Sequence, residues 1–307
     1  MSKTKLWSRE HPRIKELIFI WKRIKSSPLS LAGLAIVLFF TFIAVLAPVL
    51  APPQTIRDPY MMPRYGYSPT PKPPSPEIPF GTTEGQYDLY YGIIWGTRTA
   101  YRIGVLVVAV SALIGIAIGS IAGYYKGVID EVLMRITDII LAFPALILAM
   151  AFVVAFGRSL DSITLALILV WWPSYARLIR GEVLKVTAED YVEAAKAVGC
   201  SDLRVMIRHV IPNTIFPLVI MASLDIGSVV LTAAALSFLG LGAPTGYSDW
   251  GQIISLSRNW ITGAPGNPFA YWHTYLIPGA FLFLFVMGWN LLGDALRDVL
   301  DPMMRRR

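Results

Sequence analysis

Few side chains in this sequence are arranged for covalent or metal chemistry. The single cysteine, Cys200, excludes an intramolecular disulfide, and His11, His209 and His273 lie too far apart to match a zinc-ligand spacing. The sequence contains no GxxxxGK(S/T) loop for a phosphate and no nucleophile–base arrangement that would support catalysis. We therefore expect a chain without enzymatic activity, catalytic residues, bound metal or cofactor.

One carboxylate occupies an unusual position. Asp225 lies well inside an apolar stretch that runs from about Asn213 to Leu239. A carboxylate exposed to lipid would cost a few kcal/mol, so this side chain should face other helices, a partner subunit or water. Two interpretations remain open: Asp225 lines a substrate pathway, or it makes a hydrogen bond between helices.

A second candidate site is the polar segment between two apolar stretches, residues 181–212. Thr187 and Asp190 have the spacing of a capping box, which predicts a helix over residues 188–198. Gly199 is a suitable residue to end that helix, and a second helix is expected from Asp202 to Ile211.

The two faces of the first predicted helix differ in polarity. The pattern predicts that Val192, Ala195 and Val198 face the membrane domain. The charged face toward the cytoplasm consists of Glu189, Glu193 and Lys196. The small residues Ala194 and Ala195 would permit close approach by another protein.

The elements that position these residues are predicted to be membrane-spanning helices. Hydrophobic residues make up 55% of the chain and charged residues only 15%, and the apolar residues fall in long runs. A basic segment of 28 residues before the first run is too long for the usual cleaved signal peptide. Six runs are long enough to span a bilayer: Leu29–Leu50, Ile103–Tyr125, Ile136–Phe156, Ser162–Ile179, Asn213–Leu239 and Tyr275–Leu292.

The basic residues predict the orientation of these spans. Most of the 27 lysines and arginines fall in segments that share one side when both termini lie in the cytoplasm. The net charge of +7 is explained by this asymmetry, and we expect no binding of nucleic acid.

Prolines and glycines indicate how the spans and loops are built. Residues 51–80 contain ten prolines, which predicts an extended excursion over the outer face, and 241–273 is a Gly-, Pro- and Trp-rich outer loop. In the second span, Gly115, Gly119 and Gly123 form a small-residue stripe that should press on another helix. Pro144 and Pro173 are expected to kink the third and fourth spans or to open local backbone hydrogen bonds there.

The order of motifs resembles a known family. Glu193-Ala194-Ala195, with Gly199 and then Pro212, is similar to the EAA loop of ABC importer permeases, and in particular to the second permease subunit of the dipeptide and oligopeptide importers. The resemblance covers roughly residues 79–302, and its further stretches are residues 130–135, 142–144, 191–199, 208–213, 235–242 and 290–298.

This resemblance implies an all-α, polytopic membrane protein of the cell membrane, with the type I ABC importer fold. Its partners would be a second homologous permease, two ATPase subunits that bind ATP and Mg, and an external substrate-binding protein. The residues that would couple to the ATPase are Glu193, Ala194, Ala195 and Gly199. The expected divisions are a cytoplasmic segment 1–28, a first span 29–50, an external segment 51–96, a core 97–294 with the coupling loop 181–212, and a cytoplasmic tail 295–307.

The substrate is less well defined by the sequence. Members of the family commonly have a Gly-Thr-Asp…Gly-Arg-Asp stretch before the second span, whereas this chain keeps only Gly81, Thr82 and Asp88 of it. Peptides are expected, with oligosaccharides, nickel or other small solutes as alternatives. An ion-coupled secondary transporter would need further ionisable residues near the midplane, and a membrane-embedded enzyme would need a catalytic cluster.

Overall fold

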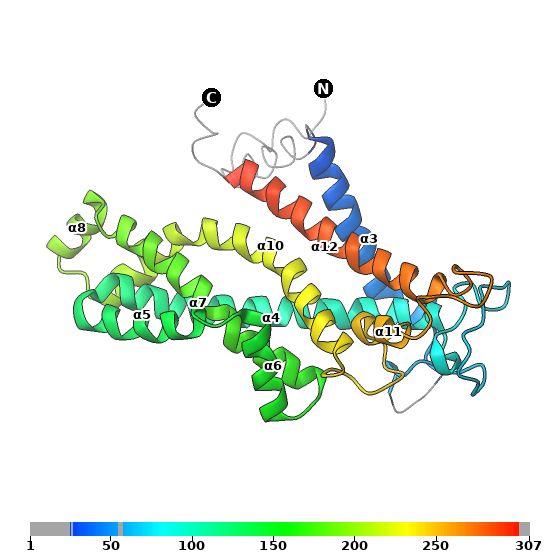
Figure 1. The fold of residues 1–307 in the computed structure, drawn as a ribbon. Helices are drawn as coiled ribbons and strands as arrows, with labels where there is room; N and C mark the ends of the chain where they lie inside the picture. The colour runs from blue at the N-terminus through cyan, green and yellow to red at the C-terminus, as the bar shows by residue number, and fades with distance from the viewer. Residues whose placement is uncertain (1–24, 26, 55–57, 301–307) are drawn as a thin grey trace, which may run out of the picture.

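The computed structural model describes residue 25, residues 27–54 and residues 58–300. This part is almost entirely helical, with isolated β-bridges but no β-strand (Figure 1). The predicted segment 1–28 and tail 295–307 lie largely outside the described residues. The helices are α3 Pro28–Leu50, α4 Leu89–Tyr125, α5 Gly127–Leu141, α6 Ala145–Phe156, α7 Leu160–Val186, α8 Asp190–Ala197, α9 Asp202–Val205, α10 Ile211–Phe238, α11 Trp250–Leu256 and α12 His273–Leu300, with a 3₁₀ turn η1 Glu84–Gln86 and a π-helical turn η2 Met206–Val210.

The number of spans agrees with the six that the sequence predicts. Within the described residues, α3, α4, α7, the run from α9 through α10, and α12 are long and apolar enough to cross a bilayer. The sixth span is the pair α5 and α6, which meet at an angle of 89°. Pro144 precedes α6 at this bend, so the predicted kink is confirmed there, whereas α7 continues through Pro173.

Helix α4 begins earlier than predicted. The hydropathy of the sequence predicts a start near Ile103, but the helix starts at Leu89 and has 37 residues. At 1.5 Å per residue its length is about 55 Å, well beyond a hydrocarbon core of about 30 Å. The boundary expected at 96/97 therefore falls inside this helix, whose first turns are largely buried within the protein.

The small-residue stripe of α4 packs directly against α7, as predicted. A Cβ atom on Gly115, Gly119 or Gly123 would lie less than 3.0 Å from an atom of α7. Ser111 extends the contact, and its hydroxyl donates to the carbonyl of Ile168 at 3.3 Å. Helices in lipid gain little from apolar burial, so this close backbone approach is the main source of α4–α7 association.

Residues 58–88 and 241–272 fold together over the first turns of α4; we call these two segments the outer cap. The indole of Trp95 donates to the carbonyl of Ala51 at 2.9 Å, and the amide of Ser248 donates to the carbonyl of Tyr60 at 2.8 Å. The hydroxyl of Thr99 donates to the carbonyl of Ser248 at 2.8 Å. The Pro-rich segment is thus packed against both α4 and the later outer loop (Figure 1).

The segment that departs from the family pattern is part of this cap. Thr82 and Thr83 are buried, and Glu84 accepts a hydrogen bond of 2.7 Å from the indole of Trp260. Asp88 caps α4 by accepting from the amide of Tyr91 at 3.1 Å, and burial raises the pKa of this carboxyl. Both the retained residues Thr82 and Asp88 and the altered residues Thr83 and Glu84 therefore make contacts that hold the cap together.

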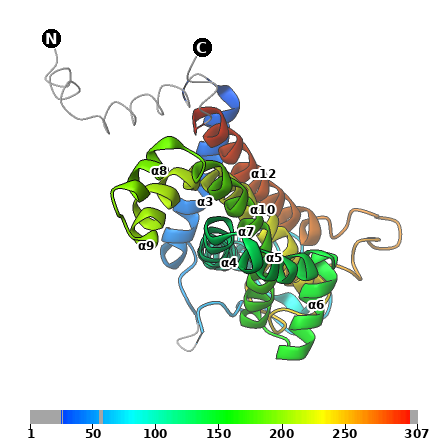
Figure 2. The same cartoon turned by 90° about the vertical axis from the view of Figure 1, so that its left-hand side faces the viewer.

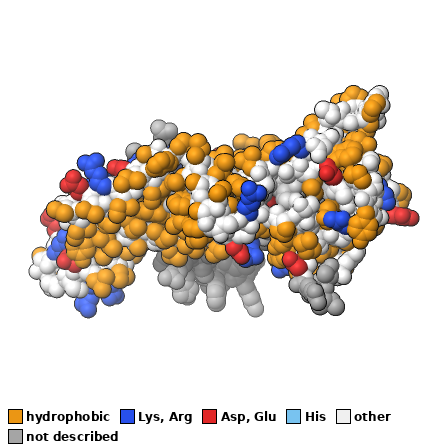
Figure 3. All heavy atoms as spheres, turned by 60° about the horizontal axis from the view of Figure 1, so that its bottom comes forward, with side chains coloured by type: hydrophobic (Ala, Val, Ile, Leu, Met, Phe, Trp, Pro, Cys, Tyr) orange, Lys and Arg blue, Asp and Glu red, His pale blue; other side chains and the backbone are white. Residues whose placement is uncertain are grey.

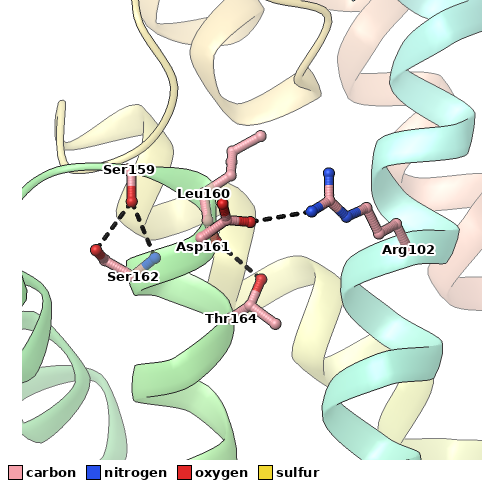
Figure 4. A network of polar contacts seen from close by, with 6 residues as sticks. All are labelled: Arg102, Ser159, Leu160, Asp161, Ser162 and Thr164. Carbon is pink, nitrogen blue, oxygen red and sulfur yellow. Dashed lines mark hydrogen bonds and ion pairs between the residues drawn. The ribbon is translucent and has the colours of Figure 1, made fainter.

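An ion pair joins α4 to α7 near the outer cap (Figure 4). Arg102 and Asp161 are 3.1 Å apart, and their side chains are 57% and 83% exposed. Ser159 begins α7 by accepting a hydrogen bond from the amide of Ser162 at 3.0 Å. Because the ion pair is so exposed, it contributes at most about 1 kcal/mol to stability.

The remaining surface fits a bilayer. In Figure 3, a mostly hydrophobic band of surface lies left of centre. Charged side chains gather on either side of this band, at the left end and in the right half of the view. Helices α3 and α12 pack together through Phe40, which makes edge-on contacts with Phe281 and Phe285. The start of α3 and the end of α12 lie on the same side of the molecule, as an even number of spans requires (Figures 1 and 2).

Candidate functional site

The polar loop between α7 and α10 contains the short helix α8, which begins two residues later than predicted. Helix α7 continues to Val186, so Thr187 lies at its C-terminal end, where its hydroxyl donates to the carbonyl of Leu184 at 3.1 Å. Glu189 occupies the position before α8 and makes no side-chain cap. The predicted capping box of Thr187 and Asp190 is therefore wrong, because the preceding span is longer than its hydropathy indicates.

Gly199 ends α8 as the sequence predicts. Its φ is +83°, its amide donates to the carbonyl of Lys196 at 2.9 Å, and the amide of Cys200 donates to the carbonyl of Ala195 at 3.1 Å. This pair of bonds is a Schellman motif, which favours glycine because a side chain is strained at positive φ. A Cβ on Gly199 would meet no atom within 4 Å, so its surface is open to an approaching protein.

The second predicted helix is not separate from the following span. After the four residues of α9, the π-helical turn η2 leads into α10 without interruption. Pro212 lies in the first turn of α10, where a proline is tolerated, and the side-chain amide of Asn213 donates to the carbonyl of His209 at 2.6 Å. Single π-helical turns are often found at functional sites.

The residues of the predicted charged face are exposed, and those of the predicted apolar face are buried in part. Val192 is fully buried and Ala195 is half-buried, whereas Val198 is 79% exposed. Val198 follows the last helical residue, Ala197, so the helical period no longer sets its direction. The exposed residues of the helix include Glu193, Ala194 and Lys196, and Glu189 directly before the helix is exposed as well.

The end of α4 anchors this loop. The hydroxyl of Tyr124 donates to the carboxylate of Asp202 at 2.6 Å, and the ammonium group of Lys196 lies 4.8 Å from the centre of the Tyr124 ring. Figure 2 shows α8 and α9 side by side at this end of the molecule. Sequence reasoning missed Tyr124, because a tyrosine at the end of a span is equally typical of an interfacial anchor.

Helix α5 is held to α7 by charged side chains. Arg180 donates two hydrogen bonds to the two carboxylate oxygens of Asp130, at 2.5 and 2.6 Å, and Arg177 pairs with Asp138 at 2.5 Å. The pair of Arg180 and Asp130 is mostly buried, at 34% and 16% exposed. Its two-point geometry makes it stronger than an exposed pair, so α5 is fixed beside α7.

Asp225 lies on α10, apart from the loop, and faces a cavity of about 210 Å³. The side chain is half-buried and faces Trp171 and Tyr175 of α7. Among the residues that the structure describes, no lysine or arginine forms an ion pair with it. The cavity is lined by the α5–α6 bend, α7 and α10: Ile140, Leu141, Phe143, Ala145, Val170, Trp171, Ser174, Met221 and Asp225. The described residues contain no cluster of His, Cys, Asp or Glu suited to a metal.

Two family descriptions match the sequence. Residues 115–306 match the family described as binding-protein-dependent transport system inner membrane component. Residues 19–69 match the N-terminal transmembrane domain of oligopeptide transport permease C. The first match covers α5 to α12 and therefore includes both the coupling loop and Asp225.

Individual relatives are similar over most of their length. The chain is 38% identical to the dipeptide transport system permease protein DppC of Alkalihalophilus pseudofirmus, over 93% of this chain and 89% of the relative. It is 36% identical to the probable D,D-dipeptide transport system permease protein DdpC of Escherichia coli, over 92% and 90%. It is 37% identical to the glutathione transport system permease protein GsiD of Pectobacterium atrosepticum, over 71% and 70%.

A solved structure supports the fold. A chain of the MetNI methionine ABC transporter in an inward-facing conformation has a TM-score of 0.55 with this chain and is 17% identical to it. The similarity covers 68% of this chain and 96% of that one. At this identity the likeness shows the fold alone, which is that of an ABC importer transmembrane domain.

Proposed function

The chain belongs to the family of binding-protein-dependent transport system inner membrane components, and from this premise we propose that it forms half of the pathway of an importer for di- or oligopeptides. The protein is an ABC transporter permease subunit and a multi-pass protein of the cell membrane. The observation that carries the peptide assignment is the 38% identity to a dipeptide permease along 93% of the chain.

Two further relatives support peptides over the alternatives. With 36% and 37% identity, they are named for a dipeptide and for glutathione, which is itself a peptide. The segment from Gly81 to Asp88 that departs from the family pattern lies in the outer cap, where Glu84 accepts a hydrogen bond from the indole of Trp260. No feature of the described residues favours an oligosaccharide, nickel or an ion-coupled mechanism.

The exposed surface of α8 is the proposed contact with an ATPase subunit. Glu193 and Ala194 are exposed, Ala195 is half-buried, and Gly199 leaves open space beside the helix end. Small residues allow close approach, and Glu193 offers a charged hydrogen-bond acceptor at the same surface. ATP and Mg would be bound by two partner ATPases, so this chain would convert their closure into movement of its spans.

Asp225 is the proposed pathway residue. Its carboxylate faces a cavity bounded by three different parts of the bundle, and a charged side chain inside a span commonly marks a substrate route. A second permease would complete the route on the other side, and an external binding protein would deliver the solute to the outer cap.

Reconstitution of the whole complex tests the assignment. The permease pair, its ATPases and its binding protein would be placed in liposomes that contain ATP, and uptake of radiolabelled dipeptides and tripeptides would be compared with uptake of an oligosaccharide. We expect ATP-dependent peptide uptake only. Uptake of the sugar without the peptides would refute the substrate assignment while leaving the permease role intact.

A further inference from the structure

We propose that the cavity beside Asp225 receives a primary ammonium group of the transported solute, namely the N-terminal ammonium of a peptide. The proposal rests on the peptide-import function above and adds the chemical group that is recognised and the residue that recognises it.

The first argument concerns charge. Asp225 lies within the bundle of spans, where an uncompensated carboxylate is costly, and the described residues offer it no cationic partner. Trp171 and Tyr175 face it, but both are neutral donors that orient a carboxylate without cancelling its charge. The site is therefore complementary to a cation that the chain itself does not supply.

The position of the two donors supports the same interpretation. Trp171 and Tyr175 are four residues apart on α7, so they lie on one face of that helix and turn toward α10 together. The Tyr175 side chain is fully buried, and Trp171 lines the cavity together with Asp225. The two donors therefore hold the carboxylate beside the cavity, where a ligand can reach it.

The second argument concerns the backbone. The break between Leu141 and Ala145, where α5 and α6 meet at 89°, forms one wall of the cavity. Irregular backbone at membrane depth is tolerated only where protein buries it or where it lines a cavity. Such broken helices commonly mark solute sites in transport proteins. The break and the carboxylate are independent features of the sequence, and the fold brings them to the same cavity.

The size of the cavity limits what it holds. Its volume of about 210 Å³ is far more than one water molecule needs, but it is smaller than the roughly 300–1,000 Å³ of a typical small-molecule site. The cavity therefore accommodates one end of a peptide while the rest of the solute lies outside it. Apolar neighbours such as Phe143, Val170 and Met221 suit the first side chain of the peptide, which lies next to its ammonium group.

The structural alternative is that Asp225 only joins α10 to α7 by hydrogen bonds. The two roles respond differently to Asp225→Asn, which keeps hydrogen-bonding capacity and shape but removes the charge. A structural tie would survive the change in large part, whereas an ammonium site would lose its charged partner.

The test measures the binding of peptides to the permease pair with its ATPases in lipid nanodiscs, without nucleotide. The external binding protein is left out, so that its own recognition of peptides does not contribute to the measured affinity. Trialanine, N-acetyl-trialanine and alaninamide would be titrated by calorimetry into the wild type and Asp225→Asn. Asp161→Asn, on the exposed outer ion pair, is the matched control for loss of one carboxylate.

We expect trialanine and alaninamide each to bind the wild type and Asp161→Asn with equal affinity. Both ligands should bind Asp225→Asn at least about tenfold more weakly, because one charge-assisted hydrogen bond is lost. N-acetyl-trialanine should bind the wild type as weakly as trialanine binds Asp225→Asn. The acetylation comparison needs only the wild type, so it remains decisive if the variant does not assemble.

Equal binding of trialanine and N-acetyl-trialanine to the wild type would overturn the proposal, as would unchanged affinity in Asp225→Asn. A different result is expected if the ammonium site is right and the peptide-import function is wrong. The binding of alaninamide would then still depend on Asp225, but the complete importer with its binding protein would take up no peptide. Peptide uptake that is intact in the wild type and does not depend on Asp225 would refute only the ammonium site.

Discussion

Replacing Gly199 by valine should abolish most ATP-driven uptake while leaving membrane insertion intact. The φ of +83° at this residue is strained for any L side chain and most of all for a β-branched one, at a cost of about 2 kcal/mol. The change also weakens the Schellman bonds that Gly199 and Cys200 donate to Lys196 and Ala195.

The size of the effect follows from how weakly the loop is held. Val192 is the only fully buried residue of α8, so the free energy that holds this short helix in place is small. A cost of about 2 kcal/mol then lowers the ratio of native to non-native loop by a factor of roughly 30. We expect uptake to fall by at least about tenfold.

The assay is peptide uptake by the reconstituted importer, with the amount of assembled complex measured in the same vesicles. Gly266→Val is the matched control, because Gly266 has a φ of +82° and equally open surroundings but lies in the outer cap. Gly199→Asn is the second control, since asparagine tolerates positive φ. Both controls should keep most of their uptake. Wild-type uptake by Gly199→Val, or equal losses in Gly199→Val and Gly266→Val, would refute the reasoning.

Three further predictions follow from the contacts of single residues. Tyr124→Phe removes a hydrogen bond of about 1.5–3 kcal/mol to Asp202 but keeps the ring. The backbone amides of residues 190–205 should then exchange hydrogen faster, and peptide uptake should fall several-fold. Unchanged exchange would show that Tyr124 does not anchor the loop. Arg180→Lys loses the two-point contact with Asp130 and should lower the melting temperature by a few degrees, as measured by differential scanning fluorimetry; an unchanged value would contradict the contact's role. Burial raises the pKa of the Asp249 carboxyl, which means that the folded protein favours the protonated form. The contribution of this carboxyl to the free energy of unfolding is therefore complete at pH values below the usual carboxyl pKa and is lost as the pH rises through the raised pKa. Asp249→Asn should therefore melt higher than the wild type at pH 7 and show a smaller difference at pH 4, and the opposite trend would exclude this explanation.

The spans could be predicted from the sequence because membrane helices need long apolar runs. The predicted start of the first span, Leu29, differs by one residue from the start of α3 at Pro28. The same reasoning misplaced the start of α4 by many residues, because its first turns lie under the outer cap and not in lipid. Asp88, a good N-cap directly before Leu89, was the available signal for the true start.

The coupling loop was predicted well where local chemistry determines the conformation and poorly where a neighbouring element does. The positive φ of Gly199 is a local property, so the sequence was sufficient to predict the helix end. The position of Thr187 depends on how far α7 continues, which hydropathy underestimates. For Asp225, the spacing of Trp171 and Tyr175 on one face of α7 was a usable signal, but the α5–α6 wall of its cavity depends on tertiary packing.

Helix α4 is a single unbroken rod that touches the coupling loop at Tyr124 and, through the ring contact of Trp95 with Tyr60, the outer cap. A rod of about 55 Å is a lever arm: a tilt of about 5° about one end displaces the other end by about 5 Å. A movement of the loop at Tyr124 that turns α4 by only a few degrees would therefore move the outer cap by several ångströms. The residues that decide when the outer side opens need not be near the nucleotide, since the geometry of this one helix transmits the motion across the membrane.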